Sequence, residues 1–489
     1  MSRARARRFL LALAVCAALV SLVLGGCGGG GDDGAAADQS ERPRGQRAER
    51  GAPNFVIVLT DDQDWSSAAG MPKVQRLLAR RGTTYENAFA SLPLCCPSRA
   101  TLVTGQYAHN HGVFSNKPPA GGYQALTRER DTLGVWLQRA GYRTAWIGKY
   151  LNGYGLEGDA RVPPGWDRWF GLMGFSSLLM YGFDASVDGE VKHWGGRPEH
   201  YQTDVLARQA ARFVRRAPAG APLFLVMATL APHDEADTVD VGPRDPRPAP
   251  RHEGALDDAR LRLPPGVNEA DVSDKPKHLR KPRLTPDELA ELDRINRARR
   301  ESLLAVDDAV ASLIETLRET GRLDETVFVF TSDNGYFLGE HRMTGKNLLP
   351  YRGLAGVPLI VRGPGFAAGK RVAAAVGNVD LPATITRLAG LEPTREPDGV
   401  PLTELRRNDA RRRVLLLEGT SYSAVRTADY LYVEHHRGAR ELYDLRRDPH
   451  ELRNVADDPR YADAQERLAA ALAELRTCEG GACRVFVGP

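Results

Sequence analysis

Two pairs of oxygen-bearing side chains each follow a short apolar run in this sequence. Asp61-Asp62 follows the run NFVIVLT, and Asp333-Asn334 follows the run TVFVFT. Either pair alone is typical of a turn or a helix cap. Together they offer three carboxylates and an amide, a set that suits Ca²⁺ or Mg²⁺ better than zinc, which favours His and Cys ligands. The pattern therefore indicates a site for a hard divalent cation.

A cysteine provides a second chemical feature. Cys95 lies in the string LCCPSR, and Pro97 suits the first turn of a helix predicted over residues 97–104. A Cys just before a helix faces the positive end of the helix dipole, where an anion is favoured. Arg99 lies four residues further on, one turn away and on the same face. We expect Cys96 to be a buried or semi-buried free thiol.

Further polar side chains lie just past predicted strands. Lys149 follows a strand predicted over 143–147, and His233 follows one predicted over 222–229. In parallel α/β sheets, ligands bind beyond the carboxyl ends of the strands. Lys149, His233 and the two acidic pairs are therefore expected to meet at one edge of a sheet.

These motifs together resemble those of the type I, formylglycine-dependent sulfatases. The string C-x-P-S-R followed by A-T-L-V-T-G-x-Y is similar to the signature of that family. The other matching motifs occur in sequence order over most of residues 53–460: Asp61-Asp62, G-K-Y at 148–150, Pro232-His233, Asp333-Asn334-Gly335, Gly339 through Gly345-Lys346, and E-L-Y-D-L before Asp448-Pro449. The subgroup of N-acetylglucosamine-6-sulfatases and heparan 6-O-sulfatases also shares C-C-P-S-R, H-N-H and G-K-Y-L-N.

The resemblance implies an alkaline-phosphatase-like α/β fold. It also implies hydrolysis of a sulfate monoester, from a sulfated sugar or an aryl sulfate, to an alcohol and inorganic sulfate. In that family a formylglycine-generating enzyme oxidises the Cys to 3-oxoalanine (Cα-formylglycine) during export. One hydroxyl of the hydrated aldehyde attacks sulfur, and the other then loses its proton so that sulfate is expelled. Cys95 would be this nucleophile and a metal ligand, with Ca²⁺ as the usual ion, Mg²⁺ as the alternative, and the other ligands being Asp61, Asp62, Asp333 and Asn334.

The resemblance also gives roles to the cationic residues. Arg99 and Lys149 would orient the nucleophile, whereas His233 and Lys346 would contact the sulfate or the leaving-group oxygen, one of them as general acid. One position departs from the family, because many sulfatases have Lys-x-His where Lys149 is followed by Y-L-N. The base for sulfate elimination is therefore left open among His109, His111 and Asn152.

Composition limits the alternatives. The chain has 489 residues, of which 42% are hydrophobic and 26% charged, an ordinary globular composition. Its net charge of +4 is too small to indicate a nucleic-acid partner. Two other classes stay open beside a sulfatase. One is a related hydrolase of phosphate or phosphonate esters, and the other is a catalytically silent protein that binds sulfated glycans.

The N-terminal residues have the features of an export signal. Several Arg precede an apolar run over 9–24, which predicts a signal peptide over residues 1–26. The run ends at Cys27 in a string that resembles a bacterial lipobox, and residues 27–51 have the composition of a flexible tether. We therefore expect an exported protein anchored through lipid on Cys27 to the extracytoplasmic side of the cell membrane. A secreted protein is the alternative, and both the general secretory and the twin-arginine export routes stay open.

The remaining chain divides into a predicted catalytic domain over 52–395 and a smaller α+β subdomain over 396–489. In the first, alternating elements predict a sheet with helices on both faces. Its strands are expected at 54–60, 143–147, 222–229, 326–331 and 357–361, and its helices at 71–81, 97–104, 132–140, 202–215 and 286–319. In the second, three short strands precede a helix over 462–476.

Two further segments carry expectations. Residues 235–285 lack periodicity and are interpreted as a surface excursion that could border the substrate cleft. Their basic clusters, Lys275 to Lys277 and Arg280 to Arg283, are expected to be solvated, with anionic substrate as the alternative role. Cys478 and Cys483 are either joined in a local disulfide or are two free thiols.

Overall fold

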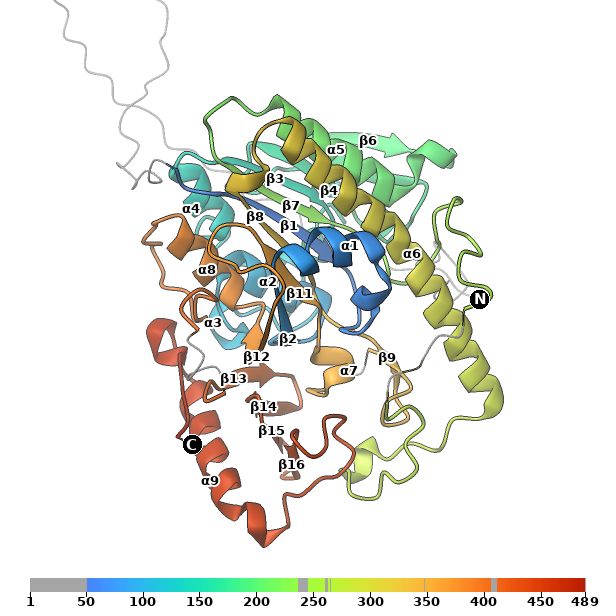
Figure 1. Cartoon of the computed structure of the whole chain (residues 1–489), viewed down its shortest axis with the longest axis vertical. Helices are drawn as coiled ribbons and strands as arrows, with labels where there is room; N and C mark the ends of the chain where they lie inside the picture. The colour runs from blue at the N-terminus through green and yellow to red at the C-terminus, as the bar shows by residue number, and fades with distance from the viewer. Residues whose placement is uncertain are drawn as a thin grey trace, which may run out of the picture. The chain divides into compact units, whose positions relative to one another are not determined.

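A mixed sheet of ten strands forms the centre of the fold in the computed structural model (Figure 1). The structure describes residues 51–235, 245–259, 263, 265–346, 348–405 and 411–488, and all counts refer to these residues. In spatial order the strands are β12 (Lys370–Gly377), β2 (Thr83–Phe89), β11 (Leu359–Arg362), β8 (Thr326–Ser332), β1 (Asn54–Thr60), β7 (Leu223–Ala228), β3 (Arg143–Gly148), β4 (Arg168–Leu172), β5 (Phe183–Val187) and β6 (Glu190–Trp194).

The middle of this sheet is parallel. β1 pairs in parallel with β7 on one side and with β8 on the other, and β3 and β4 continue the parallel set beyond β7. β1, β7 and β8 are buried along their whole length, as their uninterrupted apolar sequences predict. Because β11 and β5 run antiparallel to their neighbours, the sheet is mixed. The carboxyl ends of β1, β3, β7 and β8 lie along one edge.

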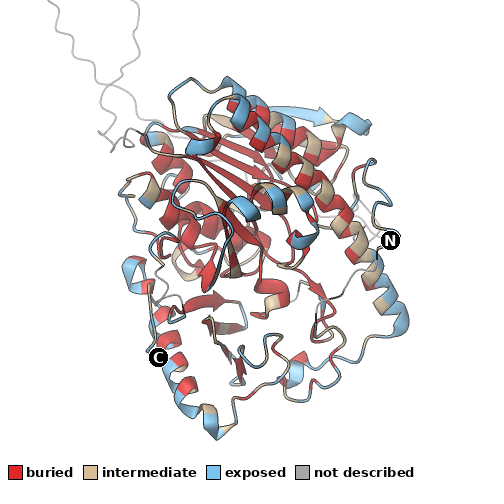
Figure 2. Ribbon diagram, viewed as in Figure 1, coloured by how far each residue is buried: buried red, intermediate tan, exposed pale blue. Residues whose placement is uncertain are grey.

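Helices cover both faces of the sheet, as predicted. Alternate residues of β1 belong to different cores: Phe55, Ile57 and Leu59 to one, and Val56 and Val58 to the other. The first core includes side chains of α2, α4 and α8, and the second includes side chains of α1, α5 and α6. Figure 2 shows the central strands of the sheet buried, whereas the edge strand β6 is exposed. The helices are α1 (Pro72–Leu77), α2 (Cys95–Thr104), α3 (Ala108–His111), α4 (Leu133–Arg139), α5 (Gln202–Arg216), α6 (Pro286–Glu319), α7 (Arg352–Ala355) and α8 (Asp380–Leu388).

Two helix starts bear on the site. α6 has the predicted bounds, and Thr285 and Glu288 form a capping box at its first turn. α2 begins two residues before its predicted start, because the Ser98 N–H donates to the Leu94 carbonyl oxygen at 3.0 Å. Cys95 is therefore the first residue of the helix rather than a residue that precedes it.

The C-terminal region contains an antiparallel sheet of four strands and a helix. Its third core also includes Phe89 and Tyr351 from the catalytic region, and a buried bidentate ion pair joins Asp380 to Arg413. A disulfide joins Cys478 to Cys483 with an S–S distance of 2.07 Å. The boundary at 395/396 stays a prediction. The elements are β13 (Leu415–Glu418), β14 (Tyr422–Arg426), β15 (Tyr430–His435), β16 (Arg440–Asp444) and α9 (Ala462–Leu475).

Some expectations differ from the structure. β2, β4, β5, β6, β12 and β14 were not predicted. The prediction that Lys275 is solvated is wrong, because its ammonium group is buried, lies 3.4 Å from a carboxylate oxygen of Glu269 and donates to the Leu452 carbonyl oxygen at 3.1 Å. The predicted signal peptide, Cys27 and the tether up to residue 50 lie outside the described residues. Within the part of the chain that is described, no helix is both long and apolar enough to cross a bilayer.

Candidate active site

The two acidic pairs meet at the carboxyl ends of neighbouring strands. Asp61 and Asp62 follow β1, and Asp333 and Asn334 follow β8. The backbone N–H of Asp62 donates to Asp333 Oδ1 at 3.0 Å, and Asn334 Nδ2 donates to Asp62 Oδ1 at 2.6 Å. Asp62 has a φ of 65°, in the left-handed region that few non-glycine residues adopt. The chain therefore turns sharply here and directs both carboxylates into one space.

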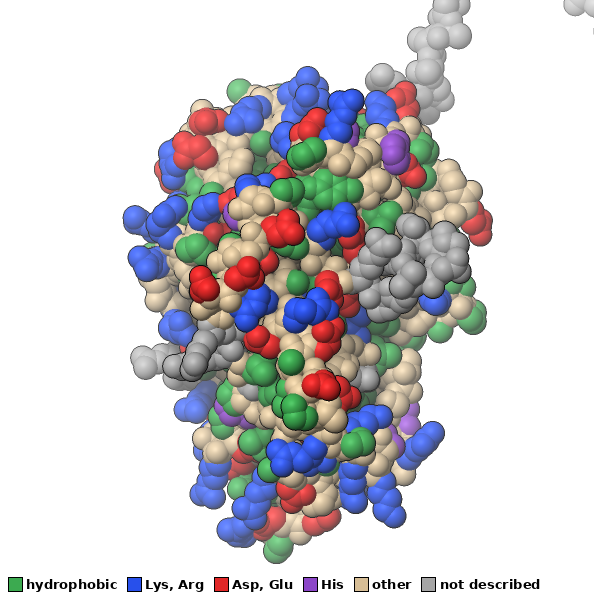
Figure 3. Space-filling model, turned by 90° about the vertical axis from the view of Figure 1, so that its right-hand side faces the viewer, with side chains coloured by type: hydrophobic (Ala, Val, Ile, Leu, Met, Phe, Trp, Pro, Cys, Tyr) green, Lys and Arg blue, Asp and Glu red, His purple; other side chains and the backbone are tan. Residues whose placement is uncertain are grey.

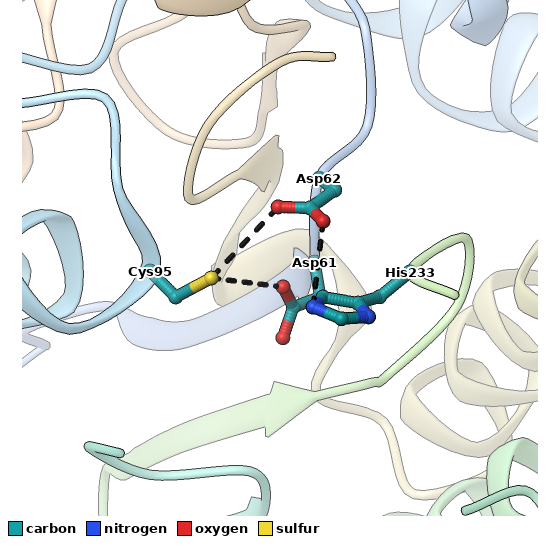
Figure 4. A group of neighbouring side chains, drawn as sticks. All are labelled: Asp61, Asp62, Cys95 and His233. Atoms are coloured by element: carbon teal, nitrogen blue, oxygen red, sulfur yellow. Dashed lines mark hydrogen bonds and ion pairs between the residues drawn. The ribbon is translucent and has the colours of Figure 1, made fainter. Parts of the chain in front are cut away.

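Cys95 enters this space from the first turn of α2. Its Sγ lies 3.4 Å from Asp61 Oδ1 and 3.8 Å from Asp62 Oδ1, and the residue is fully buried (Figure 4). Burial, with the negative charge of Asp61, holds the pKa of the Cys95 thiol well above its usual value. An unmodified Cys95 is therefore protonated and a poor nucleophile.

Two buried cations, Arg99 and Lys149, form ion pairs with the carboxylates of the site. Arg99 Nε donates to Asp333 Oδ2 at 2.7 Å, and its Nη2 lies 3.1 Å from Asp61 Oδ2. Lys149, just after β3, forms a buried ion pair with Asp61, and its carbonyl oxygen accepts from Arg99 Nη1 at 2.6 Å. Burial alone would raise the pKa of Asp61, but the charges of Lys149 and Arg99 outweigh burial and hold that pKa below its usual value.

His233 and Lys346 form the side of the group that is open to solvent. The Lys346 ammonium lies 2.8 Å from Asp62 Oδ2, 2.9 Å from His233 Nε2 and 4.0 Å from Cys95 Sγ. His233 Nδ1 lies 2.6 Å from the Asp234 carbonyl oxygen, which can only accept. His233 therefore carries its proton on Nδ1, and Nε2 accepts from Lys346. The Lys346 side chain is 24% exposed, whereas those of Asp61 and Asp62 are fully buried.

The donor set fits a hard cation. Asp61, Asp62, Cys95 and His233 each offer an atom within 4.8 Å of the others. Asn334 Oδ1 is buried and has no hydrogen-bond donor, which is uncommon for an amide oxygen unless an ion accompanies it. Burial and the charge of Asp61 raise the pKa of Asp333 to about 6, so an additional positive charge would favour its ionised form. The oxygens of Asp61, Asp62, Asp333 and Asn334 could hold Ca²⁺ or Mg²⁺.

The three candidates for the elimination base differ in their hydrogen-bond partners. Both ring nitrogens of His109 are engaged, with Glu418 Oε1 and the Cys478 carbonyl oxygen, each at 2.8 Å. Those of His111 are engaged with Thr101 Oγ1 and the Val113 N–H, each at 3.1 Å. Burial, with the charge of His109, lowers the pKa of His111 to about 3. The structure thus places both rings in supporting contacts, and the side-chain oxygen of Asn152 is buried without a partner.

One residue of the site was missed by sequence reasoning. Arg299, from the middle of α6, is buried and donates to the backbone carbonyl oxygens of Asp62 and, at 3.1 Å, of Pro232. Its guanidinium lies 3.9 Å from the centre of the Tyr336 ring. It therefore connects the loops that follow β1, β7 and β8. The available signal was an Arg on the apolar face of an amphipathic helix, between Leu292 and Leu303.

Comparisons with known proteins agree with this geometry. A family model described as Sulfatase matches residues 53–391, and one described as N-sulphoglucosamine sulphohydrolase, C-terminal, matches residues 339–478. The chain is 29% identical to the N-acetylglucosamine-6-sulfatase of Homo sapiens, over 96% of this chain and 90% of that one. It is 34% identical to the extracellular sulfatase SULF-1 homolog of Drosophila melanogaster, over 71% of this chain but only 30% of that longer protein.

A solved structure gives the same result for the fold. It is described as a complex with its substrate D-glucosamine-2-N,6-O-disulfate, and it superposes with a TM-score of 0.72 at 25% identity. The match covers 87% of this chain and 97% of that one. The fold is therefore that of the alkaline-phosphatase-like sulfatases. Because the sulfatase family model covers well over half of the chain, this protein belongs to the sulfatase family and is a sulfuric ester hydrolase.

Proposed function

We propose that this protein hydrolyses a sulfate monoester of a sulfated sugar, with Cys95 converted to formylglycine as the nucleophile beside a calcium ion. The observation that carries the proposal is the position of Cys95, whose Sγ lies 3.4 Å from Asp61 Oδ1 and 4.0 Å from the Lys346 ammonium. The glucosamine-6-sulfatase relative and the disulfated glucosamine complex support a sulfated amino sugar as substrate. Aryl sulfates would serve as surrogate substrates.

The ion would be held by Asp61, Asp62, Asp333 and Asn334. When bound, it would act as a Lewis acid that neutralises a sulfate oxygen and favours the deprotonated nucleophile. The modified side chain supplies a hydrated aldehyde, which has one hydroxyl for attack on sulfur and a second whose deprotonation allows sulfate to leave. Water is consumed in the net reaction, and an alcohol and sulfate are released.

Arg99 and Lys149 position the reacting groups. Arg99 holds Asp61 and Asp333 in fixed orientations through the planar fork of its guanidinium. Lys149 compensates the charge of Asp61 at Oδ2, the same oxygen that Arg99 contacts. The N-terminus of α2 points at the same space, and its dipole favours the negative charge that the sulfate group brings. These fixed charges are in place before substrate binds, so little reorganisation accompanies the reaction.

His233 and Lys346 would serve the departing alcohol. The hydrogen bond from Lys346 Nζ to His233 Nε2 places the shared proton on Lys346. Lys346 can therefore donate to the ester oxygen as the S–O bond breaks, and His233 Nε2 can relay a proton to restore it. Both residues lie on the open side of the group, where the leaving sugar must be. The base for sulfate elimination stays open among His109, His111 and Asn152.

The maturation and location of the protein form part of the proposal. A formylglycine-generating enzyme would act on Cys95, and the predicted signal peptide would export the chain. Similarity to an extracellular sulfatase supports export. The string at Cys27 supports a lipid anchor at the extracytoplasmic side of the membrane, with a secreted form as the alternative. Metabolic labelling with a radioactive fatty acid would distinguish the two, because only the anchored form incorporates it.

Mass spectrometry of the peptide that spans residues 94–99 tests the central claim. The protein would be produced with and without a formylglycine-generating enzyme, and each sample assayed with glucosamine-6-sulfate, an aryl sulfate and an aryl phosphate. We expect an aldehyde at Cys95 and sulfate turnover only in the first sample. A thiol that persists in active protein would refute the mechanism, and faster turnover of the phosphate would favour the phosphate-ester hydrolase.

A further inference from the structure

A hollow of about 520 Å³ lies outside the catalytic group described above. Two segments line it. One leads into the first turn of α6, and the other leads from the loop after β9 (Phe337–Leu338) into β10 (Thr344–Gly345). Its size is that of a small-ligand site. The lining residues are Lys281, Pro282, Arg283, Leu284, Thr285, Glu288, Arg342, Met343 and Thr344.

The charge of the lining is positive. Lys281 and Arg283 are exposed, and Arg342 is half-buried. Among the residues that the structure describes, the guanidinium of Arg342 donates to the backbone carbonyl oxygens of Glu269, Ala270 and Lys281, each at 2.8 Å, and these uncharged partners do not neutralise it. The single acid of the lining, Glu288, is engaged by Thr285 N and Oγ1 at 2.8 and 2.9 Å.

The lining is held in place by local hydrogen bonds. Asn268 exchanges two hydrogen bonds with the backbone of Leu284, at 2.9 and 3.0 Å. Its own N–H donates to the Gly339 carbonyl oxygen at 2.9 Å. Asn268 therefore joins the two segments of the lining, and Arg342 joins them again through the Lys281 carbonyl oxygen. The hollow does not require a rearrangement to present its cations.

The hollow is also close to the catalytic group. Thr344 lines it, and Lys346, two residues later, reaches Asp62 and His233. Two residues of chain span at most about 7 Å. Along α6, Glu288 precedes Arg299 by eleven residues, which is about 16 Å of helix. A ligand a few sugar residues long could therefore reach from the sulfate position to the hollow.

We propose that this hollow binds a second anionic group, a sulfate or a carboxylate, on the same glycan chain as the sulfate ester that is hydrolysed. The inference rests on the proposed function and makes its substrate an acidic oligosaccharide rather than a monosaccharide. On the face shown in Figure 3, Lys and Arg side chains are interspersed with Asp and Glu. The hollow differs from that mixed surface, because its lining has three cationic side chains and a single carboxylate, Glu288, which is already hydrogen-bonded to Thr285. A concave surface with this excess of positive charge is suited to a polyanion.

A second basic hollow provides a matched control. Arg208, Arg212, Arg215 and Arg216 of α5 line a hollow of about 350 Å³. α5 ends before β7 begins, so its last turn lies toward the amino ends of the parallel strands, at the edge opposite Cys95. Replacing Arg212 and Arg216 with Ser removes the same number of positive charges as replacing Lys281 and Arg283. Net-charge effects on a polyanion are therefore the same for both double variants.

The test compares the double variants K281S/R283S and R212S/R216S with a highly sulfated tetrasaccharide and with D-glucosamine-6-sulfate. We expect the ratio of kcat/KM for the tetrasaccharide to that for the monosaccharide to fall roughly tenfold in K281S/R283S, as for loss of one or two partly screened ion pairs. The same ratio should stay unchanged in R212S/R216S. An unchanged ratio in K281S/R283S, or an equal fall in both variants, would overturn the proposal.

A binding measurement separates this proposal from the proposed function. Calorimetric titration of the Cys95→Ala protein with the tetrasaccharide requires no turnover. Weaker binding when K281S/R283S is added to Cys95→Ala supports the hollow even if no sulfate is ever released by the wild type. Equal binding with and without K281S/R283S refutes the hollow even if sulfate hydrolysis is established.

Discussion

Arg99 Nε donates to Asp333 Oδ2 at 2.7 Å, and both side chains are completely buried. The same guanidinium lies 3.1 Å from Asp61 Oδ2, so a single cation orients two carboxylates that come from different strands. A buried charge that loses its partner is strongly destabilising, whereas an exposed pair contributes little. Arg99 therefore matters both for the geometry of the site and for the stability of the fold.

Arg99→Lys keeps the charge but removes the planar fork, so we expect kcat to fall by about 100-fold, as when one fixed donor is lost from an active site. Arg99→Leu should also lower the free energy of unfolding, by about 3 kcal/mol, because Asp61 and Asp333 lose a buried partner. Urea unfolding and steady-state kinetics measure the two effects. Wild-type stability and activity in Arg99→Leu would contradict this account.

Asp333→Ala should lose bound metal and activity together. Asp333 is buried beside Asp62, whose backbone N–H donates to Asp333 Oδ1 at 3.0 Å, so the substitution removes one carboxylate of the candidate ligand set. Elemental analysis of the purified protein for calcium is the direct measurement. Glu190→Ala, on the exposed strand β6, is the control and should keep the metal. Calcium retained at full stoichiometry in Asp333→Ala would show that the ligand set is wrong.

Replacing Cys95 separates the two halves of the proposed cycle. Cys95→Ala should release no alcohol, because no oxygen is available to attack sulfur. Cys95→Ser offers an ordinary hydroxyl, whose sulfate ester lacks the second hydroxyl that expels sulfate. We expect at most one equivalent of alcohol per enzyme from Cys95→Ser and a sulfated peptide in its digest, both measurable by rapid quench and mass spectrometry. Sustained turnover by either variant would exclude the mechanism.

Arg299 is expected to act as a positioning residue. It donates to the backbone oxygens of Asp62 and Pro232, so its loss frees the loops that carry Asp62 and His233. Arg299→Gln should weaken calcium binding about tenfold and lower kcat more than it changes KM, in line with losses seen when supporting partners of metal ligands are removed. Arg300→Gln, the half-buried neighbour on α6, is the control. Unchanged calcium affinity in Arg299→Gln would leave Arg299 a purely structural role.

His111 should make stability depend on pH. Its folded pKa of about 3 lies below the usual 6.5, so the unfolded chain binds the extra proton between these values. Its contribution is therefore fully present above pH 6.5 and is lost as pH falls toward 3, by up to about 5 kcal/mol. Urea unfolding of wild type and His111→Gln across this window should show a shallower slope for the variant, with the exposed His193→Gln as control.

The variant His111→Gln also tests whether His111 is the base for sulfate elimination. A ring with both nitrogens engaged and a pKa of about 3 is a poor base near neutral pH. We therefore expect kcat of His111→Gln to stay within about tenfold of wild type, since general base catalysis by a positioned side chain contributes 10²-fold or more. A thousandfold loss of kcat without unfolding would contradict this expectation and identify His111 as the base.

The sequence predicted the parts of the fold that depend on local pattern. β1, β7 and β8 are continuous apolar runs buried on both faces, and α6 carries its own capping box. β2 and β12 escaped prediction because TTYENAF lacks a continuous apolar run and the run in KRVAAAVG is mostly alanine, which is depleted in strands. The two strands pair with each other, and β2 also pairs with β11. The missed strands are thus defined by tertiary partners rather than by their own residues.

The residues of the site also divide into those that the local sequence predicts and those that depend on tertiary contacts. The positions of Asp61, Asp62, Lys149, Asp333 and Asn334 could be anticipated because each follows a recognisable strand. Outside the site, the burial of Lys275 could not be anticipated, because it depends on Glu269 and on a carbonyl group of the C-terminal region. Arg299 could not be assigned to the site either, because the carbonyl oxygens that it binds become neighbours only when the sheet forms.

The complete burial of Cys95 constrains when the cell can modify it. Asp62 and Asn334 contact each other across 272 positions of sequence, so the enclosure around the thiol cannot close until the ribosome has delivered β8. Before the enclosure closes, the thiol is accessible to the active site of a modifying enzyme. After it closes, the thiol is buried. Folding of the catalytic region therefore ends the period in which the proposed oxidation can take place.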